Sequence, residues 1–237
     1  MNRNDKRAIV VGASSGIGLE VARLLQEQGW TVGAAARRTD RLQEFAISEQ
    51  IDITTEDAGQ RLLQLIERLG GLDLYFHASG IGHQNRSLQE DIEMSTVKTN
   101  ALGFTRMIGT AYRYMASHGG GHIAVISSIA GTKGLGPAPA YSATKAMQNA
   151  YIEALEQLAN AQRLNIRFTD IRPGFVATDL LNDGNHYPLL LSKESVARDI
   201  VRSLELHRHV RIIDCRWRLI TALWRLIPRC LWRRLKL

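Results

Sequence analysis

Arg7-Ala8-Ile9-Val10-Val11-Gly12-Ala13-Ser14-Ser15-Gly16-Ile17-Gly18 runs from an apolar segment directly into a glycine-rich turn. The apolar segment predicts a buried strand over residues 7–11. Beyond it, Ile17, Val21 and Leu24 recur at the spacing of a helix face. A strand, a glycine-rich turn and a helix in this order are typical of a βα unit that binds a dinucleotide.

The glycines of this turn have separate physical roles. Gly12 permits the tight turn, Gly16 lets the backbone approach a pyrophosphate, and Gly18 allows close packing of the helix. The helix N-terminus adds N–H donors and partial positive charge for the phosphates. The spacing, G-x-x-x-G-x-G, has one residue more between its first two glycines than the common dinucleotide motif. A purely structural βα turn is the alternative.

The second predicted strand, residues 31–35, ends in Ala36-Arg37-Arg38. At this strand end a dinucleotide-binding fold recognises the adenosine ribose: an acid binds the 2′-hydroxyl, whereas an arginine suits a 2′-phosphate. No acid stands there, and Ser14 is expected near the two arginines. The pattern favours NADP(H) over NAD(H), with merely solvated arginines as the alternative.

Strand and helix patterns alternate along the rest of the chain. Further strands are predicted over residues 47–53, 72–77, 122–127 and 166–171. Helices are predicted over residues 40–46, 56–69, 92–118, from Tyr141 to about residue 162, and 193–206. This alternation indicates a parallel, doubly wound α/β sheet in one domain, residues 1–206. A final strand and a helical tail, residues 207–237, are expected to follow.

The composition narrows the class of protein. A chain of 237 residues suits one α/β domain. Cys215 and Cys230 form no disulfide framework, and neither the cysteines nor the seven histidines have metal-ligand spacing. No signal peptide precedes the first strand, and no run of about 18 apolar residues occurs. We therefore expect a cytoplasmic protein without a metal site.

The net charge of +7 belongs to one end of the chain. Residues 207–237 hold nine Lys and Arg against one Asp, a charge of +8, which leaves −1 for residues 1–206. A basic surface over the folded domain is therefore not predicted, and neither is nucleic-acid binding.

Tyr141-Ser142-Ala143-Thr144-Lys145 sets a phenol and an ammonium four residues apart. On a helix this spacing puts both side chains on one face. A neighbouring cation favours the phenolate and lowers the tyrosine pKa from its free value of about 10. Such a tyrosine can exchange a proton with a carbonyl or alcohol oxygen. For this motif alone, an ordinary surface pair is the alternative.

Together these motifs resemble the short-chain dehydrogenase/reductase family in its compact single-domain form, over roughly residues 7–206. The matching motifs are Gly12-x-x-x-Gly16-x-Gly18, Asp52, Gly80, Asn100, Ser127-Ser128, Tyr141-x-x-x-Lys145 and Pro173-Gly174-x-Val176-x-Thr178. The resemblance implies a Rossmann-like sheet of about seven strands with a nicotinamide cofactor. It also implies a homo-oligomer, a dimer or a tetramer.

The resemblance carries residue roles with it. Tyr141 matches the catalytic acid/base, and Lys145 matches the lysine that lowers its pKa and binds the nicotinamide ribose. Ser128 would hydrogen-bond the substrate oxygen, and Asn100 would hold a water for the proton relay. The cofactor-binding positions are Gly12, Ser14, Ser15, Gly16, Ile17, Gly18, Arg37, Arg38, Asp52, Ile53, Ala78, Ser79, Gly80, Asn100, Tyr141, Lys145, Pro173, Gly174, Val176 and Thr178. Asp52 would contact the adenine, and the segment from Pro173 to Thr178 would orient the nicotinamide.

The sequence departs from the family pattern at two places. Val11 stands where the family often has threonine, and His77-Ala78-Ser79-Gly80 stands where it often has Asn-Asn-Ala-Gly. Because those asparagines brace the central strands, the second change concerns local packing more than chemistry. We interpret His77 as a structural residue at a strand end.

The motifs predict an NADPH-dependent reductase or dehydrogenase that interconverts a carbonyl and an alcohol by hydride transfer. The substrate should lie among residues 81–90, 129–140 and 175–191. Leucines in the last segment are compatible with a lipophilic substrate, or with a core or a lid. The alternative function is a non-catalytic NADP(H)-binding protein that docks to a membrane or a protein partner through its tail.

The tail, residues 215–237, combines arginine with tryptophan. On a helical projection, one half collects Trp217, Leu219, Ile220, Leu223, Trp224, Leu226, Ile227, Leu231 and Leu235. The other half collects Arg218, Arg225, Arg229, Arg233 and Lys236; Arg216 and Arg234 depart from the pattern, and Pro228 should kink or divide the helix. A basic amphipathic helix suits an anionic membrane, here its cytoplasmic face. The alternatives are packing on the protein's own body, on a partner subunit or over the substrate mouth.

Overall fold

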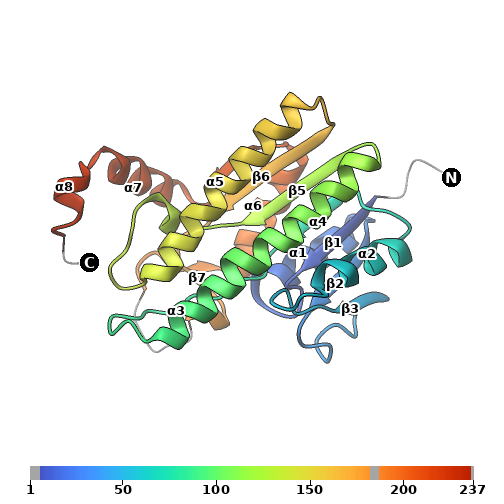
Figure 1. Ribbon diagram of the computed structural model, residues 1–237, viewed down its shortest axis with the longest axis horizontal. Coiled ribbons are helices and arrows are strands. Elements are labelled where there is room, and N and C mark those ends of the chain that lie inside the picture. Colours follow the sequence, from blue (N-terminus) through green and yellow to red (C-terminus); the bar gives the residue numbers. More distant parts are fainter. Residues whose placement is uncertain (1–5, 182–186, 236–237) are drawn as a thin grey trace.

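The computed structural model describes residues 6–181 and 187–235 and confirms the doubly wound α/β fold. Seven parallel strands form one sheet in the order β3-β2-β1-β4-β5-β6-β9 (Figure 1). They are β1 (Arg7–Val11), β2 (Thr31–Ala36), β3 (Ile47–Gln50), β4 (Leu74–His77), β5 (Gly121–Ile126), β6 (Ile166–Arg172) and β9 (Val210–Ile212). The strand order reverses between β1 and β4, and such a reversal opens a crevice at the carboxyl ends of the strands.

Helices cover both faces of the sheet (Figure 1). On one face, α1 (Gly16–Glu27) packs beside α6 (Lys193–Glu205). The other face carries α2 (Ala58–Leu69), α4 (Phe104–Ser117) and α5 (Pro139–Ala161). Each helix turns a buried apolar stripe to the strands, as its 3.6-residue periodicity predicts.

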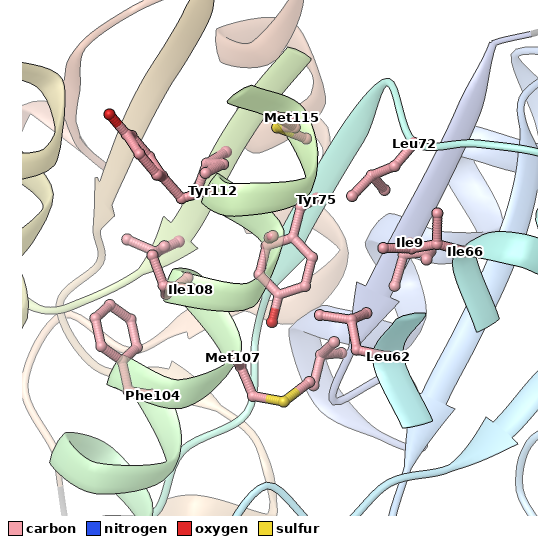
Figure 2. Packing of buried hydrophobic residues seen from close by; sticks show 14 of the residues in the cluster. Ile9, Leu62, Ile66, Leu72, Tyr75, Phe104, Met107, Ile108, Tyr112 and Met115 are labelled. Atoms are coloured by element: carbon pink, nitrogen blue, oxygen red, sulfur yellow. The ribbon is translucent and has the colours of Figure 1, made fainter. Parts of the chain in front are cut away.

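The core between the sheet and its helices holds the strand ends in place. Figure 2 shows the side of α2 and α4, where Tyr75 of β4 lies among Leu62 of α2 and Met107 of α4. All three side chains are fully buried. Burial of one such side chain contributes roughly 1.5–3 kcal/mol, so the strands form a rigid support for the loops that follow them.

The helix predicted over residues 92–118 is present but interrupted. It consists of α3 (Glu90–Val97), a π-helical turn at Lys98–Gly103, and α4. At its end, Gly103 packs so closely on the strand-end loop that a Cβ atom would lie 2.8 Å from the carbonyl oxygen of Ile53. A π turn widens the helix by one residue and frees backbone groups, and such turns are frequent at functional sites.

Two predictions near β3 are wrong in detail. Residues 40–46 form turns rather than a helix, because the buried Leu42 and Phe45 anchor them to the α1 side of the core. The third strand ends at Gln50 instead of residue 53. There, Asp52 accepts hydrogen bonds from the backbone N–H (2.9 Å) and the hydroxyl (2.7 Å) of Thr54, which bends the chain into a turn.

A small second sheet follows β6. It pairs β7 (Val176–Ala177) with β8 (Leu191–Ser192) in parallel, and the sequence pattern did not predict it. The pair closes the base of the segment predicted to border the substrate. Within that segment, residues 182–186 lie outside the described residues.

The tail forms α7 (Cys215–Leu226) and α8 (Arg229–Trp232), and Pro228 divides them as predicted. The predicted apolar half is not confirmed as one face. Trp217 and Trp232 are buried against the body, and their indole N–H groups donate to the carbonyls of Leu189 (3.4 Å) and Gly134 (2.7 Å). The exposed leucines of the tail are Leu219, Leu223, Leu226, Leu231 and Leu235. Lys236 lies outside the described residues.

The physical reason for this arrangement is that the two indoles can bury their rings while their N–H groups keep a hydrogen-bond partner.

No helix within residues 6–181 and 187–235 combines the length and apolar character needed to cross a membrane.

Candidate active site

Four loops that carry the predicted motifs meet at the carboxyl edge of the sheet. They follow β1, β4, β5 and β6, which are consecutive in the sheet, with the reversal of strand order between β1 and β4. The backbone N–H of Ala78 donates to the carbonyl of Val11 (2.8 Å), which ties the loop after β4 to the glycine-rich turn. Sequence positions as distant as Gly12 and Thr178 are thereby brought together.

Steric demand explains the glycines of the first turn. Gly12 has a φ of +93°, and a Cβ atom there would lie 2.7 Å from the backbone nitrogen of Ser79. A Cβ on Gly18 would overlap the carbonyl oxygen of Gly12. Gly16 sits across from Thr178, whose methyl group would be 3.3 Å from an added Cβ. A turn with bare backbone at the start of α1 fits the phosphates of a dinucleotide.

The strand-end arginines point to different neighbours. The Arg38 guanidinium donates to the hydroxyl of Ser15 in the glycine-rich turn (3.3 Å). Arg37 instead lies toward Asp52. Burial opposes ionisation of Asp52, but hydrogen bonds from Thr54 and the charges of Arg37 and Lys98 leave the pKa of its carboxyl lowered. The two arginines therefore bracket the region in which the adenosine ribose is expected.

A cleft of about 850 Å³ opens between the glycine-rich turn and the β7 segment. Ser14, Ser15 and Gly16 line one side, and Thr178, Tyr187 and Leu190 are among the residues on the other. The lining includes the glycine-rich turn but none of Asn100, Ser128, Tyr141 and Lys145, so the cleft borders the candidate dinucleotide site rather than the reaction centre.

Tyr141 and Ser128 stand together at the predicted reaction centre. Ser128 precedes a short 3₁₀ turn (Ile129–Thr132), and its oxygen accepts from the backbone N–H of Ala130 (3.1 Å). Burial raises the pKa of the Tyr141 phenol, and a hydrogen bond with Ser128 partly offsets that rise. The lowering of the Tyr141 pKa expected from Lys145 is therefore not found, because burial outweighs the opposing hydrogen bond from Ser128. Gly82 lies against the tyrosine, where a Cβ would be 2.6 Å from the ring.

Lys145 is buried beneath Tyr141, with its Nζ 5.7 Å from the centroid of the tyrosine ring. The ammonium donates to the carbonyl of Ile126 (3.0 Å) and to the side-chain oxygen of Gln148 (3.0 Å). Burial lowers the pKa of Lys145 to about 8, and the carboxylate of Asp170 opposes the shift. Lys145 is therefore still mainly charged at neutral pH, but it loses its proton at a lower pH than an exposed lysine does.

Asn100 lies in the π-helical turn and is fully buried. Its side chain pairs with the backbone of Ile81 at both ends: the oxygen accepts from the N–H (2.9 Å) and the amide donates to the carbonyl (2.6 Å). Its own carbonyl accepts from the side-chain amide of Gln148 (2.8 Å). Asn100 therefore fixes the loop that follows Gly80.

A buried ion pair supports the centre from β6. Asp170 accepts from the hydroxyl of Ser127 and pairs with Arg172 at 2.7 Å. Its carboxylate is almost fully buried. The negative charge of this carboxylate raises the pKa of Lys145, against the effect of burial. The serine pair at 127–128 is thereby anchored to the strand through its first member.

His77 has the structural environment predicted for it. Its Nδ1 lies 2.9 Å from the Tyr75 hydroxyl, and its ring packs edge-on to Phe104 with centroids 5.2 Å apart. Burial, with the nearby charge of Lys145, lowers the pKa of the imidazole to about 3. His77 is therefore neutral at physiological pH.

The segment after β6 carries the remaining predicted cofactor positions. Val176 is buried, and its carbonyl accepts weakly from the Thr178 hydroxyl (3.4 Å). Gly174 lies directly under the indole of Trp217, where an added Cβ would overlap the ring. Phe175 packs on the same indole, with ring centroids 5.5 Å apart. The tail therefore rests on the segment expected to orient the nicotinamide.

Comparison with known proteins places this arrangement in a family. The family model described as short chain dehydrogenase matches residues 6–187. The chain belongs to the short-chain dehydrogenase family. An uncharacterized oxidoreductase of Myxococcus xanthus is 32% identical over an alignment that covers 78% of this chain and 77% of the relative.

Solved structures share the fold. A short chain dehydrogenase from Burkholderia cenocepacia, in complex with NADP, aligns with a TM-score of 0.84 over 100% of both chains at 19% identity. An alcohol dehydrogenase from Thermococcus sibiricus, complexed with 5-hydroxy-NADP, aligns with a TM-score of 0.79 over 89% of this chain and 96% of that one, at 23% identity. At these identities the likeness concerns the fold.

Four residues of this short-chain dehydrogenase have contacts in the structure that the sequence did not predict. Gln148 contacts Lys145 and is fully buried, and its signal was a polar residue on the inner face of α5. Gly82 borders the tyrosine ring, and Arg41 lines the cleft. Trp217 belongs to the predicted apolar half of the tail, but its contact with Gly174 was not predicted. Only the spacing of Gln148 from Lys145 is visible in the sequence alone.

Proposed function

We propose that the protein is an NADPH-dependent reductase or dehydrogenase that interconverts a carbonyl and an alcohol. The observation that carries this proposal is the meeting of Ser128, Tyr141, Lys145 and Asn100 beside a turn that only glycine can form. A non-catalytic dinucleotide-binding protein would not need a proton donor beside a buried ammonium. Family membership favours the same choice.

The residues would divide the reaction among them. NADPH, when bound, supplies the hydride, and Gly12, Gly16 and the N-terminus of α1 would hold its phosphates. The Tyr141 hydroxyl donates a proton to the carbonyl oxygen as the carbon is reduced, and Ser128 donates a hydrogen bond that stabilises the charge forming on that oxygen. Lys145 keeps a positive charge below the phenol, which favours loss of its proton.

A lipophilic substrate suits the apolar side chains of the segment that follows β6. Leu181, Tyr187 and Leu190 line the neighbouring cleft, and Phe175 packs on Tyr187 with ring centroids 4.7 Å apart. The test is NADPH oxidation over ketones and aldehydes of graded chain length and polarity. Turnover should improve with apolar chain length. Preference for short, charged carbonyls would refute the substrate class, and no oxidation with any carbonyl would refute the function.

Cofactor choice follows from the strand-end arginines. Arg38 reaches the glycine-rich turn through Ser15, and Arg41 lies in the cleft, so a 2′-phosphate would meet positive charge. NADPH should bind more tightly than NADH. Because a hydrogen bond to a charged group contributes roughly 1.5–3 kcal/mol, Arg38→Ala should weaken NADPH binding about tenfold or more.

Fluorescence titration of both cofactors measures this effect. Arg37→Ala shows whether its neighbour shares the contact. NADH binding should stay unchanged in both variants, because NADH lacks the phosphate. Equal affinity of the wild type for the two cofactors would overturn the NADP(H) assignment.

We also propose that the tail is a peripheral membrane contact. Leu219, Leu223 and Leu226 of α7 are 62%, 54% and 78% exposed, so their apolar surface faces solvent. The arginines at positions 218, 225, 229, 233 and 234 of the same tail are exposed as well. The one acidic residue of the tail region, Asp214, is paired with Arg216 at 2.7 Å. Apolar side chains framed by unbalanced cations match the interface of an anionic bilayer.

A second copy of the chain is a poorer occupant of this surface. A twofold contact would set the same arginines against each other, and the like charges would oppose association. Co-sedimentation with phosphatidylcholine vesicles, with and without phosphatidylglycerol, tests the choice. The wild type should bind the anionic vesicles and release them as salt rises.

A triple variant, Leu219→Ser, Leu223→Ser and Leu226→Ser, should lose vesicle binding. The matched control changes two exposed leucines elsewhere, Leu63→Ser and Leu158→Ser, and should retain it. If the triple variant changes only the mass measured by light scattering, the leucines join subunits and the membrane proposal fails.

A further inference from the structure

Gln148 lies at the centre of the site, three residues after Lys145 on α5, and has no exposed surface. Its side-chain oxygen accepts from the Lys145 ammonium (3.0 Å), and its amide nitrogen donates to the carbonyl of Asn100 (2.8 Å). One neutral side chain therefore joins two residues that are expected to take part in the reaction.

The Asn100 carbonyl belongs to the π-helical turn, where the i→i+5 hydrogen-bond pattern departs from that of a regular helix. A buried carbonyl requires a partner, and the Asn100 side chain is already committed to Ile81. Gln148 provides that partner from a different helix. Its amide is then oriented with the oxygen toward Lys145.

We propose that Gln148 is a positioning residue for carbonyl reduction, holding the Lys145 ammonium in its charged form and fixing it to the Asn100 peptide. The inference rests on the proposed reductase function. The family resemblance assigns Asn100 a water for the proton relay; in this chain the Gln148 amide also contacts the carbonyl of Asn100. The Gln148 side chain therefore provides one of the hydrogen-bond acceptors of the Lys145 ammonium, and a substitution at position 148 can remove it.

The other groups that face Lys145 are few. Asp170 of β6 supplies a negative charge but is shared with Arg172. His77 of β4 is neutral, because burial lowers the pKa of its imidazole to about 3. Tyr141 lies on the same helix and is protonated, because burial raises its pKa. Besides Gln148, the acceptor that the ammonium contacts within residues 6–181 and 187–235 is the carbonyl of Ile126.

Titration of Lys145 tests the inference without a substrate. The chain contains six lysines, so ε-¹³C-lysine NMR resolves few signals, and Lys145→Met assigns the one of interest. Loss of a hydrogen bond to the ammonium should lower the Lys145 titration midpoint by about one pH unit in Gln148→Leu. Gln148→Glu should raise it, because a carboxylate favours the cation. Gln157→Leu, on the exposed side of α5, is the matched control and should leave it unchanged.

The pH profile of turnover links this effect to the reaction. The alkaline limb of kcat should move down in Gln148→Leu and up in Gln148→Glu, by the same amounts as the NMR midpoints. A merely structural role would lower activity or Tm without moving either quantity. If Gln148→Leu fails to fold, Gln148→Asn, which is too short to span both partners, replaces it.

The outcomes separate the two proposals. An unmoved NMR midpoint overturns the positioning role, whatever the enzyme's activity. A moved midpoint with an unmoved kcat profile overturns it as well, because the charge of Lys145 would then not matter to the reaction. Absence of NADPH oxidation in the wild type refutes the reductase function while the NMR arm still reports on the contact.

Discussion

Burial of Lys145 leads to a measurable dependence of stability on pH. Burial lowers its pKa from 10.5 to about 8 in the folded protein. In the unfolded chain the pKa returns to about 10.4. The unfolded state therefore binds the proton more tightly, and the charged lysine destabilises the fold below about pH 8. This penalty disappears as the pH rises to 10.5, and the difference between the two pKa values corresponds to about 3 kcal/mol.

Comparison with Lys145→Met isolates the effect. Urea unfolding, followed by tryptophan fluorescence, gives the free energy of unfolding of both proteins at a series of pH values from about 7 to 10.5. Groups common to both proteins cancel in the difference. The methionine leaves the oxygens of Gln148 and Ile126 without their donor, which adds an offset that does not depend on pH.

From about pH 7 to 10.5, the free energy of unfolding of the wild type should rise by about 3 kcal/mol relative to that of Lys145→Met. Gln157→Leu controls for general disturbance of α5 and should run parallel to the wild type. If the difference in unfolding free energy between the wild type and Lys145→Met does not change from neutral to alkaline pH, the pKa of Lys145 is not lowered by burial. The role given to the charge of Lys145 in the reaction would then be refuted as well.

Three further predictions concern the site. Tyr141→Phe should abolish most turnover yet bind NADPH nearly as the wild type does, because only the proton donor is lost; near-normal kcat would exclude Tyr141 as the acid. Gly82→Ala should reduce kcat about tenfold or more, because the new methyl would lie 2.6 Å from the tyrosine ring. Gly136→Ala, which meets open space, is its control, and equal rates in the two variants would contradict the steric argument. Asp170→Asn should lower the urea-unfolding free energy by about 3–5 kcal/mol by leaving Arg172 buried without its partner, and a loss below about 1 kcal/mol would argue against a structural ion pair.

Periodicity and glycine spacing predicted the sheet because both are local signals. The apolar run at 7–11 and the glycines after it favour a strand and a tight turn, whatever the tertiary contacts of the following segments. Residues 40–46 show the limit of that reasoning. Leu42 and Phe45 have helical spacing, yet they are buried from a turn, because their contacts with α1 and its strand decide the backbone.

The interrupted helix around Asn100 could not be read from the sequence. Its π turn lies where Gly103 packs against the carbonyl of Ile53 and where Gln148 reaches across from α5. Both are tertiary contacts between segments far apart in the chain. The position of Asn100 was predicted, but its connection to Lys145 was not.

The contacts of the tail could not be predicted for a related reason. A helical projection groups residues by angle and cannot say which part of an apolar half meets the body. Trp217 packs on Gly174, whose lack of a side chain makes room for the indole ring. The indole N–H of Trp232 donates to the carbonyl of Gly134. Leu223 and its neighbours were left facing solvent.

Transfer of isotope tests the central claim, that this site reduces a carbonyl with a hydride from NADPH. NADPH deuterated at the transferring position of the nicotinamide would be mixed with enzyme and an apolar ketone, and the alcohol analysed by mass spectrometry. We predict one deuterium on the carbinol carbon with the wild type and almost none with Tyr141→Phe. An alcohol formed without deuterium, or formed equally well by the variant, would contradict it.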